Sequence, residues 1–287
     1  MFKARWYFRC GSWIPNEREW TKAADILIPE EKQRIGKFKY QKDAKSSLSG
    51  RLLIRKAARD ICNIPHQSQH PKRTDAGKPY LQIGDSNHIR AFNVSHSGDL
   101  VVLAGDFSHP DVDIGVDVMR IEWPSRTTVP DYFHTMRRQF TESEWQVIRR
   151  PTDEWDKMHV FYRFWCLKES YVKAIGVGLG IDLQRLEFHT KESNRGADVV
   201  CTTQLFKDGN LQPDWMFEES YIDDNHCVAV ALNQNSVIPQ TCVDRFIELT
   251  SEDLFRDLPE ALNPDVKYWR EYAGKEARPQ SKRKPSS

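Results

Sequence analysis

Hydrophobic and polar positions alternate, or recur every three to four residues, along most of the chain up to about residue 235. Short alternating runs predict strands, and the longer period predicts amphipathic helices. The first half is expected to form a strand at 3–10, helices at 16–26, 29–36 and 43–62, and strands at 91–95 and 100–105. The second half is expected to form a strand at 113–119, helices at 131–138, 142–150 and 153–175, and strands at 185–190, 199–206, 215–222 and 226–232.

Two polar stretches interrupt this pattern. "HPKRTDAGKPYLQIGDSNH", residues 70–88, is expected to be a loop around a Gly-Lys-Pro turn. Residues 250–287, which end in "EARPQSKRKPSS", are expected to be a largely disordered tail. The rest repeats one order, helix and then antiparallel strands, and "FNVSHSGDLVVLAGD" resembles "EESYIDDNHCVAVAL". The sequence therefore predicts an α+β fold of two similar halves, residues 1–113 and 114–249.

Composition excludes several classes of function. The formal net charge is +1, so no overall field would recruit nucleic acid or a membrane surface. The longest apolar run, "LVVLAG", is far too short to cross a bilayer, and the first residues do not read as a secretory signal. The six cysteines are scattered without a Cys-x-x-Cys pair. We therefore expect a cytosolic protein with reduced thiols.

The helix expected at 153–175 is unusual. Its apolar residues share one arc of the helix, made of Phe161, Phe164, Trp165, Val172 and Ile175. Lys168 falls in the middle of that arc and Glu169 on its shoulder. Charged groups at such positions either pair with a neighbour or face a functional cleft.

Asp117 poses the same question, because it lies in the apolar strand "IGVDVM" and burying a lone charge is costly. Taken alone, Asp117 could form a salt bridge, and Glu169 could pair with Lys173 for about 0.3–0.5 kcal/mol. If the two acids meet, carboxylates about 4 Å apart repel by about 4 kcal/mol at an effective dielectric constant of 20. Mg²⁺ would remove this repulsion, since it binds one or two carboxylates and completes its octahedron with water and substrate phosphate.

Basic residues that could hold a phosphate occur in three places. "KRTDAGKP" contains Lys72, Arg73 and Lys78, "KQRIGK" contains Arg34, and "NVSHSG" contains His96. Each could equally be a solvated surface feature. Neither a P-loop nor a Gly-x-Gly-x-x-Gly motif is present, which disfavours those nucleotide sites. His96 follows Ser95 on a strand, where neighbours point to opposite faces, so a histidine that donates to phosphate is favoured over a nucleophilic dyad.

Four of these motifs together resemble one family. "RTDAGKPY", "FNVSHSGD", "IGVDVM" and "FWCLKESYVKAIGVGLG" occur in the order, and near the spacing, of the Sfp-type 4′-phosphopantetheinyl transferases, over about residues 5–235. The resemblance implies a Mg²⁺-dependent monomer of two similar α+β halves, with coenzyme A in the cleft between them. It also implies a holo-acyl-carrier-protein synthase activity: phosphopantetheine passes from coenzyme A to a carrier serine, and 3′,5′-ADP is released.

By motif position, the resemblance implies roles for single residues. Asp117 and Glu169 would hold Mg²⁺ on the pyrophosphate, and Glu169 would also take the proton of the carrier serine. With Lys173 and His96 they form the expected catalytic set. The expected coenzyme A contacts are Arg34, Arg73, Thr74, Asp75, Ala76, Gly77, Lys78, Asn93, Val94, Ser95, His96, Lys168, Glu169 and Lys173. The chain departs from many bacterial members at Met119, where they carry a further acid; a thioether is a poor Mg²⁺ ligand, so water would take that place.

The resemblance further implies acidic carrier proteins as partners: carriers of the fatty acid synthase type, a mitochondrial carrier precursor and a carrier domain of an aminoadipate reductase. Residues 120–145 are expected to dock them, because this segment mixes basic and aromatic side chains: Arg120, Arg126, Arg137, Arg138, Trp123, Tyr132, Phe133 and Trp145. No nucleic acid or membrane partner is expected. Two other functions remain open, a non-catalytic coenzyme A binder and a Mg²⁺-dependent hydrolase of the coenzyme A pyrophosphate.

Overall fold

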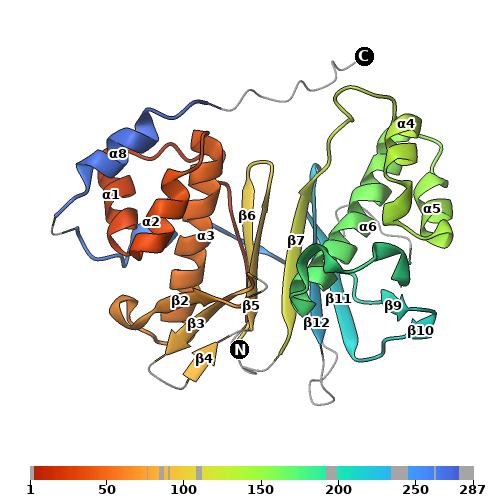
Figure 1. Ribbon diagram of the computed structural model, residues 1–287, viewed down its shortest axis with the longest axis horizontal. Helices are drawn as coiled ribbons and strands as arrows, with labels where there is room; N and C mark the ends of the chain where they lie inside the picture. The colour runs from red at the N-terminus through yellow and green to blue at the C-terminus, as the bar shows by residue number, and fades with distance from the viewer. Residues whose placement is uncertain are drawn as a thin grey trace.

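The computed structural model of the protein describes residues 3–75, 77–83, 87–89, 91–107, 112–191, 199–233, 245–261 and 263–277. Its elements form two halves that stand side by side. Strands face each other in the middle and helices cover the two outer sides, which gives four layers (Figure 1). The α+β class predicted from the sequence is confirmed.

The first half contains β1 (Lys3–Phe8), α1 (Glu17–Asp25), α2 (Pro29–Gly36), α3 (Gln41–Asp60), η1 (His66–Ser68), β2 (His70–Arg73), β3 (Pro79–Ile83), β4 (Asn87–Ile89), β5 (Phe92–Ser97) and β6 (Leu100–Asp106). The second half begins with β7 (Ile114–Arg120), α4 (Val129–Thr135), η2 (Arg137–Gln139), α5 (Glu142–Arg149) and α6 (Glu154–Ile175). It continues with η3 (Gly178–Gly180), η4 (Leu183–Arg185), β8 (Leu186–His189), β9 (Gln204–Lys207), β10 (Asn210–Leu211), β11 (Trp215–Asp223) and β12 (His226–Asn233). Most elements expected from the sequence are present, with ends that differ by a few residues.

The two halves share one strand order. β1 pairs antiparallel with β6, which pairs with its hairpin partner β5. In the same way β7 pairs antiparallel with β12, which pairs with β11. Each half thus has the order first strand, last strand, middle strand, with one long helix, α3 or α6, on the outer face (Figure 1).

Local signals explain why α6 begins and ends where it does. The Asp153 side chain accepts hydrogen bonds from the backbone N–H groups of Trp155 and Asp156 at the first turn. Gly176 ends the helix in the left-handed conformation, with φ of 70°, which a residue with a Cβ adopts only at a cost. α6 is therefore a continuous helix of 22 residues with defined ends, and each of its side chains has a definite position along the helix.

A shared hydrophobic core joins the halves. It contains Tyr7, Leu100, Val102 and Ala104 from the first sheet, and Ile114, Val116, Val118, Met216, Val228, Val230 and Leu232 from the second. A buried ion pair crosses one side of this core: Arg5 Nε on β1 donates to Glu218 Oε2 on β11 at 2.7 Å. Because the contact is apolar and extensive, the two halves form one unit.

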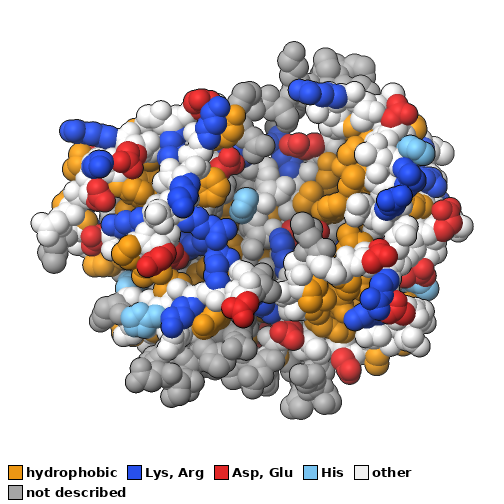
Figure 2. Space-filling view, in the orientation of Figure 1, with side chains coloured by type: hydrophobic (Ala, Val, Ile, Leu, Met, Phe, Trp, Pro, Cys, Tyr) orange, Lys and Arg blue, Asp and Glu red, His pale blue; other side chains and the backbone are white. Residues whose placement is uncertain are grey.

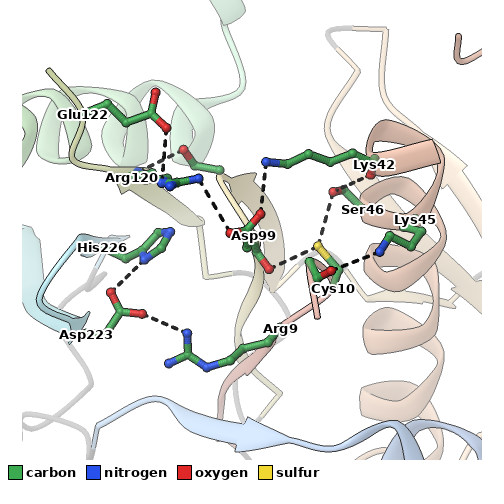
Figure 3. Close-up of polar contacts among 12 residues, drawn as sticks. Arg9, Cys10, Lys42, Lys45, Ser46, Asp99, Arg120, Glu122, Asp223 and His226 are labelled. Carbon is green, nitrogen blue, oxygen red and sulfur yellow. Dashed lines mark hydrogen bonds and ion pairs between the residues drawn. The ribbon is translucent and has the colours of Figure 1, made fainter. Parts of the chain in front are cut away.

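Exposed ion pairs join the halves at the rim. Asp99, in the turn between β5 and β6, lies 3.1 Å from Lys42 of α3 and 3.6 Å from Arg120 at the end of β7. Arg120 also lies 3.2 Å from Glu122. Figure 3 shows this chain of charges, with Asp99 between the lysine of one half and the arginine of the other. The contacts hold the turn that follows His96 against the second half.

The expected loop at 70–88 is wrong for most of its length. β2, β3 and β4 form a small antiparallel sheet, with Lys72 opposite Tyr80 and Leu81 opposite Ile89. The stretch is polar because the sheet is small, and among its residues whose burial is described, Leu81 is the one in the core. Few hydrophobic residues are needed for such a sheet, so the sequence pattern hides it.

The expected disorder of 250–287 is wrong for the part that the structure describes, which ends at residue 277. β13 (Ile247–Leu249) pairs parallel with β1, and α7 (Ser251–Phe255) and α8 (Val266–Ala273) follow. Figure 1 shows α8 lying against the outer helices of the first half. Four apolar residues are buried there, namely Leu254, Leu258, Tyr268 and Tyr272, and the Tyr272 ring stacks on Trp20 at 3.6 Å. These four apolar residues are separated by many charged residues, so the sequence pattern of the segment resembles that of a disordered tail.

The thiols follow the expectation in part. Cys10, Cys62, Cys166 and Cys227 are free, whereas Cys201 is disulfide-bonded. None of the helices in the described parts of the chain combines the length and hydrophobicity that a bilayer crossing requires.

Gly115 lets α6 lie directly on β7. A Cβ at this position would lie 2.1 Å from the Ser170 carbonyl oxygen and 2.4 Å from the Ala174 nitrogen. Both contacts are backbone atoms of α6, so no side chain could move aside. The spacing between strand and helix is therefore set by the absence of a side chain.

We predict that Gly115→Ala forces α6 away from β7 and lowers the free energy of unfolding by about 3 kcal/mol, at the upper end for overpacking. Urea denaturation measures the change. Gly180→Ala is the matched control, because nothing lies within 4 Å of its Cβ position. Equal unfolding midpoints for the two variants would contradict the close-approach explanation.

Candidate active site

The candidate site lies where the edge strands β5 and β7 meet. Side chains of β5 bind β7 directly: Ser95 Oγ donates to Asp117 Oδ1 at 2.8 Å, and the Asn93 side-chain oxygen accepts from the Val116 N–H at 3.2 Å. These contacts form a seam between the halves, which we call the β5–β7 seam. The functional side chains of both halves are thereby brought together without a backbone ladder between the two strands.

Lys173 of α6 completes a three-residue cluster in the seam. Its ammonium group donates to Asp117 Oδ1 at 2.6 Å and to Ser95 Oγ at 2.7 Å. The Asp117 carboxylate is almost fully buried, whereas the Lys173 side chain keeps 30% of its exposure. Lys173 can therefore neutralise Asp117 and still face an anion in the cleft. Three of the predicted site residues meet here.

Glu169 lies one helical turn before Lys173 and differs from it. Among the residues that the structure describes, its half-buried carboxylate has no hydrogen-bond or ion-pair partner. Burial raises the pKa of Glu169, the nearby Asp117 charge raises it further, and Lys173 opposes both. The sequence-based expectation that the two acids approach each other agrees with this influence of Asp117 on Glu169.

The donor set fits a hard divalent cation that brings most of its own ligands. Asp117 Oδ2 accepts only a weak hydrogen bond, from the Cys166 thiol at 3.6 Å, and the Glu169 oxygens are uncommitted. In the described parts of the chain, no group of three His, Cys, Asp or Glu side chains could hold a metal alone. Two carboxylates, together with water and phosphate oxygens, are a ligand set that Mg²⁺ usually takes in proteins. Met119 packs against the hydrophobic core of the second half.

His96 is exposed at the end of β5, on the strand face opposite Ser95. The protein around it lowers the pKa of the imidazole, and the positive charge of Lys173 lowers it further, while Asp43 and Asp117 oppose these effects. Arg51 also acts on the ring. His96 thus lies within electrostatic reach of both Lys173 in the seam and Arg51.

A basic pocket of about 540 Å³ opens between α2, α3 and the β2–β3 hairpin. Its lining includes Arg34 and Arg73, as the sequence predicts, together with Lys72. Figure 2 shows the blue basic side chains gathered over this part of the molecule. The described structure therefore offers one concentrated site for a multiply charged anion, on the same half as His96.

Arg51 also lines this pocket, and sequence reasoning missed it. Its Nε lies 3.0 Å from Glu31 Oε1, and Arg55 binds the same carboxylate. Burial lowers the pKa of Arg51 to about 10, and Arg73 and Arg34 add to this effect although Glu31 opposes it. One glutamate faces several arginines, so the cluster is short of negative charge. The sequence did contain a signal for Arg51: it is a charged residue near the apolar side of the helix expected at 43–62.

The "RTDAGK" segment forms the turn between β2 and β3. Gly77 has φ of 87°, and its carbonyl accepts from the Arg73 guanidinium at 2.5 Å, which orients that arginine. Thr74 Oγ1 accepts from the Lys78 N–H at 3.1 Å. Asp75 is exposed, and Ala76 lies outside the described residues.

Lys78 does not line the basic pocket. Its ammonium group donates to the Ala174 carbonyl at 2.7 Å and lies 3.3 Å from Asp113. It therefore binds the last turn of α6, where the helix dipole favours a cation. The structure gives Lys78 a role in joining the halves. Val94, another expected contact, packs against the core of the first half near Gly50.

The prediction that Lys168 contacts coenzyme A is wrong. Its side chain is 1% exposed, and its ammonium group donates to the Leu183 and Leu186 carbonyls at 2.7 and 2.6 Å. The third partner is the buried Glu144 carboxylate at 2.8 Å. Burial lowers the pKa of Lys168 and raises that of Glu144, while their mutual attraction opposes both shifts. Lys168 thus fastens α6 to α5 and β8, away from the cleft.

Comparisons with known proteins follow the two halves. A model described as 4′-phosphopantetheinyl transferase, N-terminal, matches residues 11–108, and a model of the 4′-phosphopantetheinyl transferase superfamily matches residues 113–231. The human L-aminoadipate-semialdehyde dehydrogenase-phosphopantetheinyl transferase is 47% identical over 80% of this chain and 74% of its own length. The Xenopus laevis protein of that name is 40% identical over 97% of this chain and 94% of its own. A phosphopantetheinyl transferase of Thraustochytrium is 36% identical over 80% of this chain and 78% of its own. The predicted family resemblance is confirmed.

We predict that Lys168→Met costs about 3–5 kcal/mol of folding stability, because it leaves the Glu144 charge buried without its partner. The double variant Lys168→Met with Glu144→Gln should lose less, since no uncompensated charge remains. Chemical denaturation of both variants measures the difference. Coenzyme A affinity below the unfolding transition should stay at the wild-type value, and a selective loss of affinity would instead return Lys168 to the ligand site.

Proposed function

Because the chain belongs to the 4′-phosphopantetheinyl transferase superfamily, we propose how its residues carry out the reaction of that family. The enzyme transfers the 4′-phosphopantetheine group from coenzyme A to a serine of a carrier protein and releases 3′,5′-ADP. Coenzyme A is the co-substrate. The assignment of residues below is our proposal, and the single observation that carries it is the contact of Lys173 with Asp117 at the β5–β7 seam, one helical turn from Glu169.

Coenzyme A lies across the first half in this proposal. Its 3′-phosphate enters the basic pocket, where the positive charges of Arg34, Arg51 and Arg73 are not fully balanced by acidic side chains. Its pyrophosphate reaches the seam, where His96 and Lys173 donate to it. The electrostatic influence of both Arg51 and Lys173 on His96 supports this path, because the histidine is near enough to feel charges of both anion sites. A dianion in the pocket would relieve the mutual repulsion of the arginines.

We propose Asp117 and Glu169 as the ligands of Mg²⁺. Bound Mg²⁺ would neutralise charge on the pyrophosphate, which is the main requirement of phosphoryl-type transfer. Ser95 and Lys173 hold Asp117 through Oδ1, which leaves Oδ2 directed to other partners. Met119 supplies no hard ligand, so water completes the shell.

Glu169 accepts the proton of the carrier serine in this scheme. The serine oxygen then bonds to the phosphorus that carries the pantetheine arm, and the bond from that phosphorus to 3′,5′-ADP breaks. The Glu169 carboxylate suits this role because, among the described residues, no hydrogen bond or ion pair occupies it. Lys173, one turn away, stabilises the charge that develops on the leaving group.

The name of the vertebrate relatives points to an aminoadipate-semialdehyde dehydrogenase as one bearer of the carrier serine. We propose that carriers of the fatty acid synthase type and a mitochondrial carrier precursor are also modified. We further propose a cytosolic monomer. The monomer is supported by the seam itself, because one chain provides both of its sides.

The test of the reaction is intact-protein mass spectrometry of an apo acyl carrier protein mixed with this chain, coenzyme A and Mg²⁺. We expect a mass gain of one phosphopantetheine that disappears with EDTA. A gain that persists in EDTA would remove Mg²⁺ from the proposal. No gain with several carriers would favour a coenzyme A binder, and release of 3′,5′-ADP without a carrier would favour a hydrolase.

Glu169→Gln should lower kcat by at least about 10²-fold, because the neutral amide can neither accept the proton nor bind a hard cation well. Coenzyme A affinity, measured by titration calorimetry, should persist because the basic pocket is untouched. Glu271→Gln on exposed α8 is the matched control and should keep the wild-type rate. Retention of more than a few per cent of activity in Glu169→Gln would exclude the assigned role.

In the protein without Mg²⁺, the pKa of Glu169 should lie above the usual glutamate range, because burial and the Asp117 charge disfavour the carboxylate more than Lys173 favours it. If Glu169 binds Mg²⁺, added Mg²⁺ should lower this pKa, because the cation favours the carboxylate. An NMR titration of the Glu169 carboxyl with and without Mg²⁺ measures the shift, and an unchanged pKa would contradict Glu169 as a metal ligand.

A further inference from the structure

The described C-terminal part of the chain, residues 245–261 and 263–277, lies outside both matched family models, which cover residues 11–108 and 113–231. It nevertheless packs on the first half, where β13 pairs with β1 and α8 lies beside α1 and α2. Figure 1 shows α8 on the outer side of the first half, next to these two helices. The family models do not account for this part of the chain, so its contacts are the guide to its role.

α2 is a short wall of the basic pocket and needs support from its neighbours. It has eight residues, and an isolated helix of that length is marginal in water. Its buried residues are Glu31 and Ile35, so one apolar side chain anchors it in the core. α2 nonetheless supplies Glu31 and Arg34 to the pocket. The position of Arg34 therefore depends on the elements that hold α2 in place.

Lys275, which follows α8, binds the end of α2. Its ammonium group donates to the Gly36 and Phe38 carbonyls, each at 2.7 Å. The last carbonyls of a helix have no partner within the helix, and a cation at that end interacts favourably with the helix dipole. Lys275 thus caps α2 two residues after Arg34, about 3 Å along the helix axis.

Other contacts hold the same region. The Tyr268 hydroxyl donates to the Lys32 carbonyl at 3.3 Å, and the Tyr268 side chain is buried. The Glu276 carbonyl accepts from the Gln41 N–H at 3.0 Å, at the start of α3. Residues 268–276 therefore contact both α2 and α3, the two helices that line the basic pocket.

The three arginines of the pocket differ in how they are held. Glu31 lies 3.0 Å from Arg51, and the Gly77 carbonyl accepts from Arg73. Arg34 has no hydrogen-bond or ion-pair partner among the residues that the structure describes. The backbone of α2 alone therefore places the Arg34 guanidinium.

We propose that Lys275 is a positioning residue for the 3′-phosphate of coenzyme A, because its cap on α2 fixes the backbone that carries Arg34. This inference rests on the transferase function proposed above, in which the 3′-phosphate enters the basic pocket. Lys275 itself does not line that pocket and acts through α2. Its loss should therefore weaken the binding of a ligand that carries the 3′-phosphate and spare a ligand that lacks it.

The test compares coenzyme A with dephospho-coenzyme A, the same molecule without the 3′-phosphate, by titration calorimetry. Lys275→Met should raise the Kd for coenzyme A about tenfold, the loss expected when one charged hydrogen bond to the phosphate is misplaced. The Kd for dephospho-coenzyme A should change by less than about twofold, because no contact to that ligand is altered. A merely structural role would lower the thermal transition and leave the preference for coenzyme A unchanged.

Lys267→Met on α8 is the matched control, because it removes the same charge from the same part of the chain. The Lys267 side chain is 88% exposed, and its ion pair, at 4.0 Å, is with Glu271 of the same helix. Both Kd values should stay at wild type. Lys275→Arg is the rescue variant, since a guanidinium can donate to both carbonyls, and it should recover most of the preference for coenzyme A.

Tyr268→Phe separates the position of α2 from the charge of Lys275. It removes the hydrogen bond to the Lys32 carbonyl and changes no charge. The Kd for coenzyme A should rise roughly two- to threefold, since a neutral hydrogen bond contributes less, and that for dephospho-coenzyme A should not change. Hydrogen exchange of the α2 amides should be faster in this variant and in Lys275→Met than in the control. If Lys275→Met fails to fold, Tyr268→Phe decides the question.

Two outcomes would overturn the proposal. One is an equal rise of both Kd values, which would make residues 268–276 a support of the fold alone. The other is a Kd for coenzyme A that matches the Lys267→Met control in both Lys275→Met and Tyr268→Phe. Failure of the proposed function is distinct from these outcomes. It would appear in the wild-type protein, as absent transfer or as equal binding of the two ligands.

Discussion

The close contact between the β7 backbone and α6 at Gly115 sets the geometry of the whole second half. It fixes how far the helix stands from the strand, and therefore how far Glu169 and Lys173 on the helix stand from Asp117 on the strand. The apolar core between the two sheets then holds β5 next to Asp117. A site for a metal and a pyrophosphate needs carboxylates held to within a fraction of an ångström, and rigid elements in direct backbone contact provide that precision better than loops.

Charge in this protein is left unbalanced where ligands are proposed to bind and balanced elsewhere. The arginines around Glu31 outnumber their acid, and Glu169 has no partner among the described residues. By contrast, the buried pairs that hold the fold, such as Arg163 with Glu219 at 2.6 Å, satisfy each other. An unmet charge costs folding stability and is tolerated where a ligand compensates it. Burial alone does not separate the charges proposed to bind ligands from the structural ones, since Arg51 and Arg163 are both largely buried.

The sequence predicted the long helix and the hairpins, because these follow from periodicity and from turn residues. Prediction from the sequence failed where the role of a side chain depended on which other element of the fold packs against it. Helix periodicity gives Lys168 a buried face, but only the fold reveals that α5 brings Glu144 to meet it. Arg51 was missed for the same reason, since its partners come from α2 and β2. The ordered part of 250–277 was missed because its few apolar anchors stabilise it only through a surface that another part of the chain provides.

The halves meet at two places along their sheets, and these two junctions differ. At one, Ser95 and Asp117 meet beside an open acid. At the other, β1 meets β11 through the buried pair of Arg5 and Glu218. Two identical subunits related by a two-fold axis would carry two equal junctions and hence two reaction centres. Within one chain, each junction can change independently of the other. One junction then holds the halves together, while the other carries the proposed reaction. With the proposed assignment, this asymmetry gives one reaction centre per polypeptide, although the architecture is double.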